Sequence, residues 1–430
     1  MTGQRDGESG YETIFTMETT PLKYGPGASE EVGWEIKKMG VKRVMLVSDP
    51  GVIETGITGR IQELIETEGI EVEIWGKAHV EPTAESFQEA ADFAVEGEFD
   101  GFVAVGGGTS IDTAKVSDLI ATHGGEIMDY VNPPIGGGEA PPSPLKPLLA
   151  IPTTSGTGAE ATTVAVLDIP EQKVKTGISH AYMRPHRGVV DPNLTMSLPL
   201  QVTSSTGLDV VCHAAEAYTS KPYDERQKPE SPDERPPYQG ANPIADIFAT
   251  KALEYGGKYL RRAVENGEDI EARGAMMLGA SMSGVGFGSA GVHIPHACSY
   301  PIAGLHPDYY PPGYPQDHPL VPHGWSVILT APAAFRFTYE QNPARHRQVA
   351  ELLSGESIDK ADENTLPEVI VRLMQDVGVP RGLKEVGYDE EDIDQLVNGA
   401  MQQQRLLVLS PREVGEEDLA NILRESMENW

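Results

Sequence analysis

One aspartate and three histidine-bearing segments have the residue types and spacing of a metal site. Asp209 and His213 are four residues apart, so a helix would project both from one face, about one turn from each other. His293, His296 and His323 follow downstream. A carboxylate oxygen together with imidazole nitrogens suits a borderline divalent ion such as Fe(II) or Zn(II), with one position open for a substrate. A lone histidine is more often a packed or hydrogen-bonded residue, so only the joint spacing favours a metal site.

A glycine-rich loop supplies a second kind of chemistry. Its residues Gly106, Gly107, Gly108, Thr109 and Ser110 follow an apolar run and open a helical pattern. Without Cβ atoms, the glycines let backbone amides approach a pyrophosphate, whose charge would lie at the positive end of the helix. The loop lacks the GxGxxG dinucleotide pattern, and a tight turn without a ligand is the alternative interpretation.

Two further polar segments could complete a nucleotide site. Asp49 ends the strand-like run 44–48, where its carboxylate could accept hydrogen bonds from an adenosine ribose and favour NAD over the 2'-phosphorylated form. A helix cap is the other interpretation of Asp49. Thr153, Thr154 and Thr157 lie on a glycine-rich turn after the apolar run 148–151, where hydroxyls could orient a nicotinamide ribose. By itself, this segment is an ordinary turn.

The pattern of apolar residues predicts the elements that position these side chains. From residue 41 to about 191, short apolar runs alternate with amphipathic ones, which is typical of βαβ units. The clearest unit has a helix at 86–95, a buried strand at 101–105 and a helix from 110 onward. After residue 192, helical patterns dominate, at 203–218, 243–265, 269–282 and 367–376. We therefore predict an α/β domain over residues 1–197 and a helical domain over residues 198–430.

Two irregular segments interrupt the helical half. Residues 220–238 are rich in proline and charge, and residues 304–322 are rich in proline. The first segment cannot pack as a regular element and is predicted to be an exposed excursion, and the second is irregular. Each could border a site or lie on the surface.

The charge of the chain disfavours two classes of partner. There are 33 Lys plus Arg against 65 Asp plus Glu, which gives a formal net charge of −32. Such a charge repels nucleic-acid phosphates and anionic lipids, so we expect no nucleic-acid or membrane partner. The acidic residues are scattered, which favours a surface adapted to high salt, where screening weakens self-repulsion. We therefore predict a halophilic protein.

Targeting signals are not evident in the sequence. Residues 1–10 are polar and lack the apolar core of a signal peptide, and no apolar run has the length of a membrane span. The two cysteines, Cys212 and Cys298, are too few for a disulfide framework, so we expect them to be reduced and packed as small apolar residues. The expected location is cytoplasmic.

Four motifs, in order over most of the chain, resemble those of the iron-containing alcohol dehydrogenases. They are GGGTSIDTAK, PTTSGTGAE, GLDVVCHAAEAY and VPHGWSV. More narrowly, PPYQGANP, GFGSAGVHIPHACSYPIAG and EEDLANILRESM resemble the hydroxyacid-oxoacid transhydrogenase subgroup. The resemblance implies an α/β nucleotide-binding domain, an all-α C-terminal metal-binding domain and a cleft between them, a fold shared with the dehydroquinate synthases.

The resemblance also implies site residues and cofactors. The metal ligands of the family fall on Asp209, His213, His296 and His323, so His293 is not a ligand. The nucleotide contacts fall on Asp49, Gly106, Gly107, Gly108, Thr109, Ser110, Thr153, Thr154, Thr157 and Lys175. The implied cofactors are Fe(II), with Zn(II) as an alternative, and NAD.

One position departs from the usual family pattern. Typical alcohol dehydrogenases of the family have a second histidine four residues after the third ligand, where it can relay a proton. This chain has Tyr300 there, as the transhydrogenase subgroup does. Tyr300 and His293 are therefore the candidate proton-relay residues, with a packed helix-end histidine as the alternative for His293.

The implied activity is hydride transfer between a hydroxy acid or alcohol and a carbonyl through NAD, with the metal as a Lewis acid. The subgroup implies oxidation of 4-hydroxybutyrate coupled to reduction of 2-oxoglutarate, and an NAD-linked alcohol dehydrogenase is the alternative. A lyase like the dehydroquinate synthases and a non-catalytic binding protein are further alternatives. A carboxylate substrate needs a local cation, for which Arg184, His186 and Arg187 are candidates. Self-association as a homo-oligomer is left open.

Overall fold

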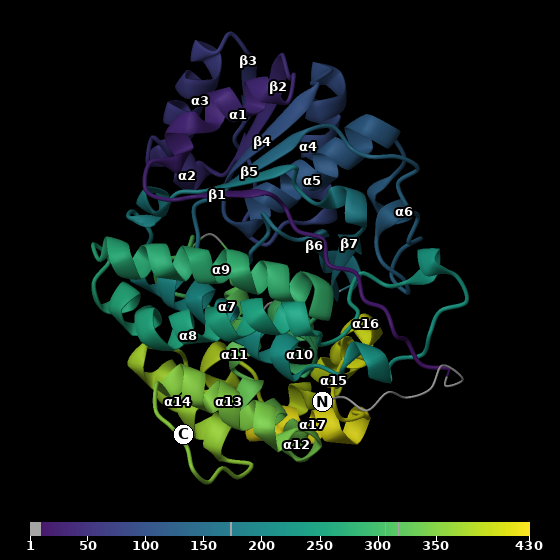
Figure 1. Cartoon of the computed structure of the whole chain (residues 1–430), viewed down its shortest axis with the longest axis vertical. Helices are drawn as coiled ribbons and strands as arrows, with labels where there is room; N and C mark the ends of the chain where they lie inside the picture. Colours follow the sequence, from purple (N-terminus) through teal and green to yellow (C-terminus); the bar gives the residue numbers. More distant parts are fainter. Residues whose placement is uncertain (1–9, 173, 306, 317) are drawn as a thin grey trace.

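A six-stranded parallel sheet organises the first half of the described chain (Figure 1). The computed structural model describes residues 10–172, 174–305, 307–316 and 318–430, so the polar start at residues 1–9 lies outside the described residues. From edge to edge the strands are β1 (Leu22–Tyr24), β8 (Arg187–Val190), β5 (Leu148–Pro152), β4 (Gly101–Gly106), β2 (Arg43–Ser48) and β3 (Glu71–Trp75).

The central strands are buried on both faces because helices cover each side. Alternate residues of β2 point to opposite faces, so Val44 and Leu46 pack against α1 (Val32–Lys38) and α3 (Ile57–Thr67). Met45 and Val47 pack on the other face, which α4 (Ala84–Gly97) and α5 (Gly108–His123) cover. The sheet is therefore the middle layer of three.

The order of the strands determines where a ligand can bind. Strand β2 pairs with β3 on one side and with β4 on the other. The chain leaves β2 toward β3 and then returns past β2 to form β4, so the loops after β2 and β4 diverge. In open parallel sheets, such a divergence at the carboxyl ends of the strands makes a binding crevice.

A two-stranded antiparallel ribbon, β6 (Val164–Ile169) and β7 (Val174–Ser179), lies between the sheet and the helical half (Figure 1). Strand β7 contacts α10 (Ile294–Gly304) of the helical half. The sequence patterns did not predict this ribbon, which joins the two halves beside the crevice.

The second half of the described chain is helical. Helix α7 (Leu200–Thr219) is buried along nearly its whole length because α8 (Pro243–Glu265), α9 (Ile270–Ala290) and α11 (His323–Ile328) pack around it. The remaining α-helices there are α10, α12 (Ala331–Thr338), α13 (Pro343–Ser354), α14 (Thr365–Asp376), α15 (Ile393–Met401), α16 (Gln404–Leu407) and α17 (Glu416–Glu425). The predicted fold class, α/β followed by all-α, is confirmed.

The first described residues contact the helical half rather than the sheet. Tyr11 forms a bridge with Gln227, and the backbone amide of Thr16 donates to the side chain of Gln239. The N-terminal segment therefore runs along the excursion at 220–238, which itself holds two short 3-10 helices, η5 (Tyr223–Glu225) and η6 (Pro232–Glu234). The expected division at residue 197 falls between η4 (Pro192–Thr195) and α7.

Among the described residues, no single helix is long and apolar enough to cross a membrane, although α9 and α10, bent by 106° relative to each other, together have the length and composition. Cys212 and Cys298 are both buried and free, as predicted.

Candidate active site

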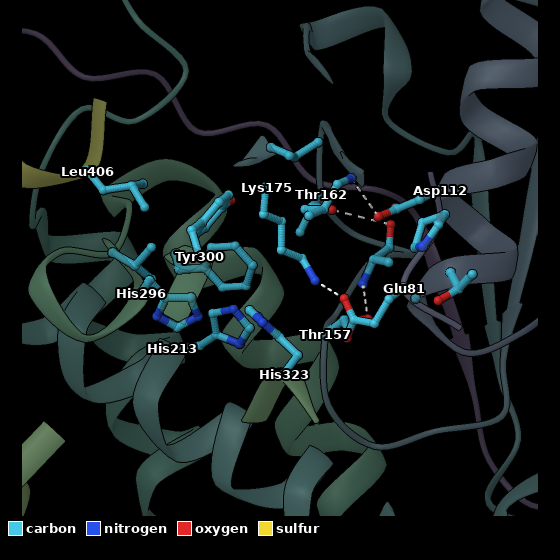
Figure 2. A pocket seen from close by; sticks show the side chains of 18 of the residues that line it. Glu81, Asp112, Thr157, Thr162, Lys175, His213, His296, Tyr300, His323 and Leu406 are labelled. Carbon is cyan, nitrogen blue, oxygen red and sulfur yellow. Dashed lines mark hydrogen bonds and ion pairs between the residues drawn. The ribbon is translucent and has the colours of Figure 1, made fainter. Parts of the chain in front are cut away.

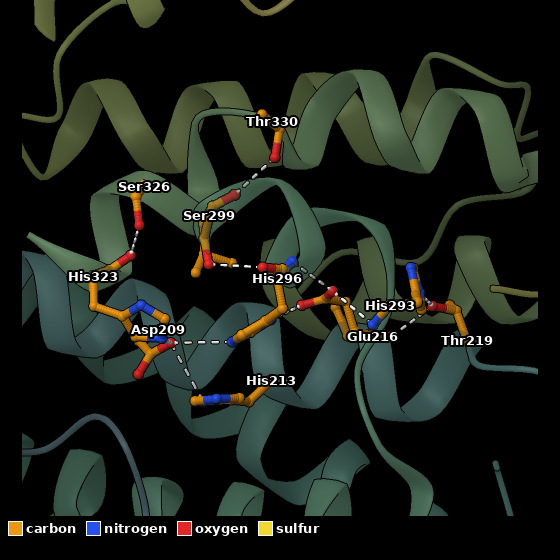
Figure 3. A network of polar contacts seen from close by, with 12 residues as sticks. Asp209, His213, Glu216, Thr219, His293, His296, Ser299, His323, Ser326 and Thr330 are labelled. Atoms are coloured by element: carbon orange, nitrogen blue, oxygen red, sulfur yellow. Dashed lines mark hydrogen bonds and ion pairs between the residues drawn. The ribbon is translucent and has the colours of Figure 1, made fainter. Parts of the chain in front are cut away.

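Four side chains from three helices meet at one point (Figure 3). Asp209 and His213 lie one turn apart on α7, His296 lies in the first turn of α10, and His323 is the first residue of α11. Each offers one ligand atom, and these atoms all lie within 4.8 Å of one another. The structure thus brings together the four residues that the family resemblance implies as metal ligands.

The distances between the ligand atoms fit a divalent ion. From Oδ1 of Asp209, Nδ1 of His213 lies at 3.4 Å, Nε2 of His296 at 3.6 Å and Nε2 of His323 at 3.7 Å. Two ligands about 2.1 Å from a tetrahedrally coordinated ion lie about 3.4 Å apart. Asp209 Oδ1, His213 Nδ1 and His296 Nε2 are buried with no hydrogen-bond partner within the described chain, which is unusual for buried polar atoms unless a ligand satisfies them.

The pKa values of the candidate ligands favour the binding of a cation. Although burial by itself would raise the pKa of the Asp209 carboxyl, the three histidines beside it lower that pKa, so it stays ionised. Burial lowers the pKa of His213 to about 3 and that of His323 to about 4, which keeps both imidazoles neutral. Neutral imidazole is the form of histidine that binds a metal.

Glu216 orients His296 from behind the cluster and was not predicted. It is fully buried on α7, and its Oε1 accepts the backbone amides of His293 at 3.0 Å and of His296 at 3.1 Å. Its Oε2 contacts Nδ1 of His296, which leaves Nε2 directed toward Asp209. Although burial lowers it, the pKa of His296 is raised to about 9 by Glu216. The helical spacing of 209, 213 and 216 is a sequence signal that could have identified Glu216.

His293 lies on the far side of Glu216 from the other histidines (Figure 3). It is fully buried, and its Nε2 lies 3.0 Å from Oγ1 of Thr219. His293 is absent from the described residues that line the cavity beside the four candidate metal ligands. These contacts match the packed helix-end histidine, and the proton-relay role of His293 stays a prediction.

The predicted nucleotide residues gather at the divergence of the loops after β2 and β4. Asp49 caps α2 (Pro50–Glu54) through the amide of Val52 at 3.0 Å, and its Oδ2 accepts the Ser110 hydroxyl at 3.2 Å. Both interpretations of Asp49 are therefore compatible with its position, since it is a helix cap that also faces the glycine loop. At Gly106, a Cβ would lie 2.2 Å from Oγ of Ser110, so only glycine fits there.

The start of α5 has the features of a phosphate site. Gly107 caps the helix without a side-chain hydrogen bond, so the first amides of α5 have no capping side chain. A Cβ at Gly107 would lie 3.3 Å from Thr154, and one at Gly108 would lie 2.7 Å from Thr157. The threonine turn thus packs directly against the glycine loop. Thr153, whose amide donates to Gly106, has a buried hydroxyl with no partner among the described residues.

Lys175 lies on β7 between the histidines and the nucleotide loops (Figure 2). It pairs with Glu81, and its Nζ lies 4.0 Å from Oδ2 of Asp168. The side chain is 3% exposed. Lys175 is thereby placed where the two halves of the site meet.

One cavity of about 130 Å³ joins the four candidate metal ligands to the candidate nucleotide loops (Figure 2). Its lining includes Gly108, Thr109, Thr157 and Lys175 from the nucleotide side and His213, His296, Tyr300 and His323 from the helical side. Tyr238 and Arg405 also line it and were not predicted. Tyr238 ends the excursion at 220–238, so this excursion borders the site.

The cations expected to hold a substrate carboxylate lie elsewhere. Arg187 is the first residue of β8, so it lies at the amino end of its strand, whereas the crevice lies at the carboxyl ends, and its Nε lies 3.5 Å from Glu35. Arg184 pairs with Glu18 at 2.7 Å, and Nδ1 of His186 accepts the amide of Leu148. None of these three side chains is among the described residues that line the cavity.

The fold and the site define a metal-dependent oxidoreductase with a nucleotide domain, and the sequence matches to known protein families agree. The profile described as "Iron-containing alcohol dehydrogenase" matches residues 19–192, and the one described as "Fe-containing alcohol dehydrogenase family, C-terminal" matches residues 238–427. This chain belongs to the iron-containing alcohol dehydrogenase family. It is therefore an oxidoreductase that acts on CH–OH groups, as predicted.

Within the family, the chain is 45% identical over 419 residues to the mitochondrial hydroxyacid-oxoacid transhydrogenase of Rattus norvegicus, covering 96% of this chain and 90% of the relative. A solved 1,3-propanediol oxidoreductase has a TM-score of 0.84 at 28% identity, covering 96% of this chain and all of that one. The sulfoacetaldehyde reductase of Bifidobacterium kashiwanohense in complex with NAD+ has a TM-score of 0.79 at 26% identity, over 97% of this chain and 99% of that one. The predicted iron and NAD agree with the family and with this complex.

Proposed function

We propose that this chain is a hydroxyacid-oxoacid transhydrogenase. It would oxidise a hydroxy acid such as 4-hydroxybutyrate to the semialdehyde and reduce an oxoacid such as 2-oxoglutarate to the hydroxy acid, with one hydride carried by NAD. The observation that carries the proposal is the single cavity shared by three of the four candidate metal ligands and the nucleotide loops. The identity of 45% to the rat transhydrogenase supports this subgroup.

The four candidate ligands would hold the metal at the wall of this cavity. A divalent ion there would polarise the reacting oxygen of the substrate, and a nicotinamide would accept or return the hydride. Asp209 supplies one negative charge to the ligand set, and the contact of Glu216 with Nδ1 of His296 leaves Nε2 directed toward Asp209. The chain's own share is positioning, and no strongly nucleophilic side chain is required.

The nucleotide loops would hold the cofactor on the opposite wall. The amides at the start of α5 would bind the pyrophosphate, and the hydroxyls of Thr153, Thr154 and Thr157 would orient the ribose near the nicotinamide. The Asp49 carboxylate would favour NAD, because a 2'-phosphate beside it would be repelled. These roles, the nucleotide contact of Lys175 and the metal binding by the four candidate ligands are all part of the proposal.

Anaerobic turnover assays test the proposal. Protein purified and loaded with Fe(II) is incubated with 4-hydroxybutyrate and 2-oxoglutarate, with and without added NAD. We expect exchange without added NAD, because a retained nicotinamide is recycled within each cycle. Accumulation of NADH from simple alcohols, with no exchange between the two acids, would instead identify an NAD-linked alcohol dehydrogenase.

We also propose that the acidic surface is an adaptation to high salt, supported by the net charge of −32. Screening by molar KCl should then increase the free energy of unfolding and the yield of refolding. Urea unfolding in 0.1 M and in 2 M KCl measures this effect, and equal stability in both would contradict the proposal. We also propose a cytoplasmic location, although the rat relative is named mitochondrial.

A further inference from the structure

Arg405 is a half-buried cation that has no carboxylate partner among the described residues. It lies on α16 and lines the same cavity as His213 and His296. Within the described chain, no carboxylate oxygen is recorded within ion-pairing distance of its guanidinium group, whereas Lys175 in the same cavity pairs with Glu81. A cation in a cavity without a counter-ion is costly unless a ligand supplies the negative charge.

Two tyrosines hold the guanidinium at the cavity. Arg405 donates to the hydroxyl of Tyr300 and also interacts with the hydroxyl of Tyr238. The centre of the guanidinium lies 5.5 Å from the ring of Tyr300 and 6.0 Å from that of Tyr238, within the range of cation–π contacts. Burial raises the pKa of Tyr238 to about 12, so its hydroxyl stays protonated.

The position of this group relative to the metal cluster follows from α10. Tyr300 comes four residues after His296, so both side chains project from one face of α10, one turn apart (Figure 2). The oxygen of Tyr300 already accepts a hydrogen bond from Arg405, so its own proton is available to a further acceptor. A ligand that reaches Arg405 therefore extends along α10 from the metal cluster.

The backbone around these residues is well anchored. The amide of Gln239 donates to Ser289 at 2.7 Å, which joins the segment after Tyr238 to the end of α9. The side chain of Gln403 donates to the carbonyl of Lys175 at 3.3 Å, which joins the start of α16 to β7. Arg405 and Tyr238 are thus held in place by elements on both sides of the cavity.

We propose that Arg405, with the hydroxyls of Tyr300 and Tyr238, binds the substrate carboxylate while the hydroxyl or carbonyl of that substrate lies at the metal cluster. This assignment rests on the proposed function and makes it more specific. A guanidinium and phenol hydroxyls are hydrogen-bond donors that match the acceptor oxygens of a carboxylate.

The test compares a charged substrate with an uncharged one. In Arg405→Gln, kcat/KM for 4-hydroxybutyrate should fall by roughly 100-fold, whereas kcat/KM for butan-1-ol should stay constant or rise. Arg405→Lys should keep part of the discrimination because it keeps the charge. Tyr300→Phe, which removes one hydroxyl only, should lose about tenfold on the charged substrate. Arg424→Gln, on the exposed surface of α17, is the matched control and should behave as the wild type.

Binding of butyrate to the Fe(II)-loaded protein, measured by calorimetry, separates this assignment from the proposed function. Butyrate should bind the wild type and Arg424→Gln, and bind Arg405→Gln at least tenfold more weakly, with metal content unchanged. Unchanged kcat/KM and butyrate affinity in Arg405→Gln would overturn the assignment and leave the transhydrogenase intact. Arg405-dependent binding of butyrate without exchange activity would support the assignment and overturn the proposed function. A wild type that binds no butyrate would also overturn the assignment.

Discussion

Titratable side chains are buried in two regions of this molecule, but they are satisfied in different ways. In the α/β half, Lys115 is fully buried and donates to Asp112 at 3.2 Å and to the carbonyl of Val164 at 2.7 Å. In the helical half, Asp209 Oδ1 and His213 Nδ1 are equally buried, yet no hydrogen-bond partner for either lies in the described chain. The difference between the two groups is whether the chain itself supplies the partner.

This difference separates side chains that the fold itself satisfies from side chains that a ligand would satisfy, although Asp112 of the first group also lines the cavity. The Lys115 group fastens α5 to β6, because Asp112 on α5 also accepts the amide of Val166 at 3.0 Å. Convergent atoms without partners, as around Asp209, instead mark a place where a ligand completes the structure. We therefore expect substitutions in the first region to change stability and substitutions in the second to change metal binding and turnover.

The largest expected effect is at His296. His296→Ala should remove bound metal and turnover together, because one of four ligands and the partner of Glu216 are lost. Metal content by mass spectrometry and the exchange assay measure this. The control is His346→Ala, another buried histidine, which is hydrogen-bonded to Thr338 and belongs neither to the four candidate ligands nor to the described residues that line the cavity, and which should keep its metal. Full activity of His296→Ala without bound metal would refute the ligand assignment.

The next largest effect is at Lys115. Lys115→Met leaves Asp112 as a buried charge without its cation, so the free energy of unfolding should fall by about 3–5 kcal/mol, with metal affinity unchanged. Urea unfolding of the metal-free protein measures the loss. The double variant Lys115→Met with Asp112→Asn should recover part of it. A loss of metal affinity in Lys115→Met would break the distinction between the two regions.

Glu216 should have an intermediate effect, because it acts on the metal through His296. Glu216→Gln keeps the shape but weakens the orientation of the imidazole, so metal affinity should fall by about 10- to 100-fold. Competition with a chelator gives the affinity. The matched control is Glu160→Gln, which should leave the affinity unchanged. Glu160 is a buried carboxyl of the α/β half that accepts the hydroxyl of Ser281.

The smallest expected effect is at Asp118, which is an instructive exception. Its Oδ2 is buried with no hydrogen-bond partner in the described chain, yet it lies on α5 outside the set of residues that line the cavity. Burial raises the pKa of this carboxyl to about 7, so a proton rather than a ligand removes the buried charge.

The sign of the pH dependence follows from that pKa. Between about pH 4 and pH 7 the native protein keeps a proton on Asp118 that the unfolded chain loses, so the free energy of unfolding decreases as pH rises and then levels off. Asp118→Asn does not titrate. Relative to the wild type, it should therefore gain roughly 1–3 kcal/mol between pH 5 and pH 8, measured by urea unfolding. If the free energy of unfolding of the two proteins changed with pH in the same way, this explanation would be contradicted.

Local patterns were sufficient for most of the fold. The predicted strand at 101–105 and helix at 243–265 match β4 and α8 to within a residue, because alternation and helical periodicity are properties of neighbouring residues. The β6–β7 ribbon was not predicted because it depends on tertiary contacts, which β6 makes with α5 and β7 makes with α10.

The site residues, too, were only partly predictable from local sequence patterns. From the sequence alone, the spacing of Asp209 and His213 predicted two ligands on one helical face, with His293, His296 and His323 as further candidates, and the family resemblance selected His296 and His323. Arg405 had no local signal, because it lies 105 residues from Tyr300. Only tertiary structure decides which buried polar atoms lack a partner, since that depends on elements far apart in the chain that converge on the same point. For this reason the metal cluster could be anticipated, whereas the proposed carboxylate subsite could not.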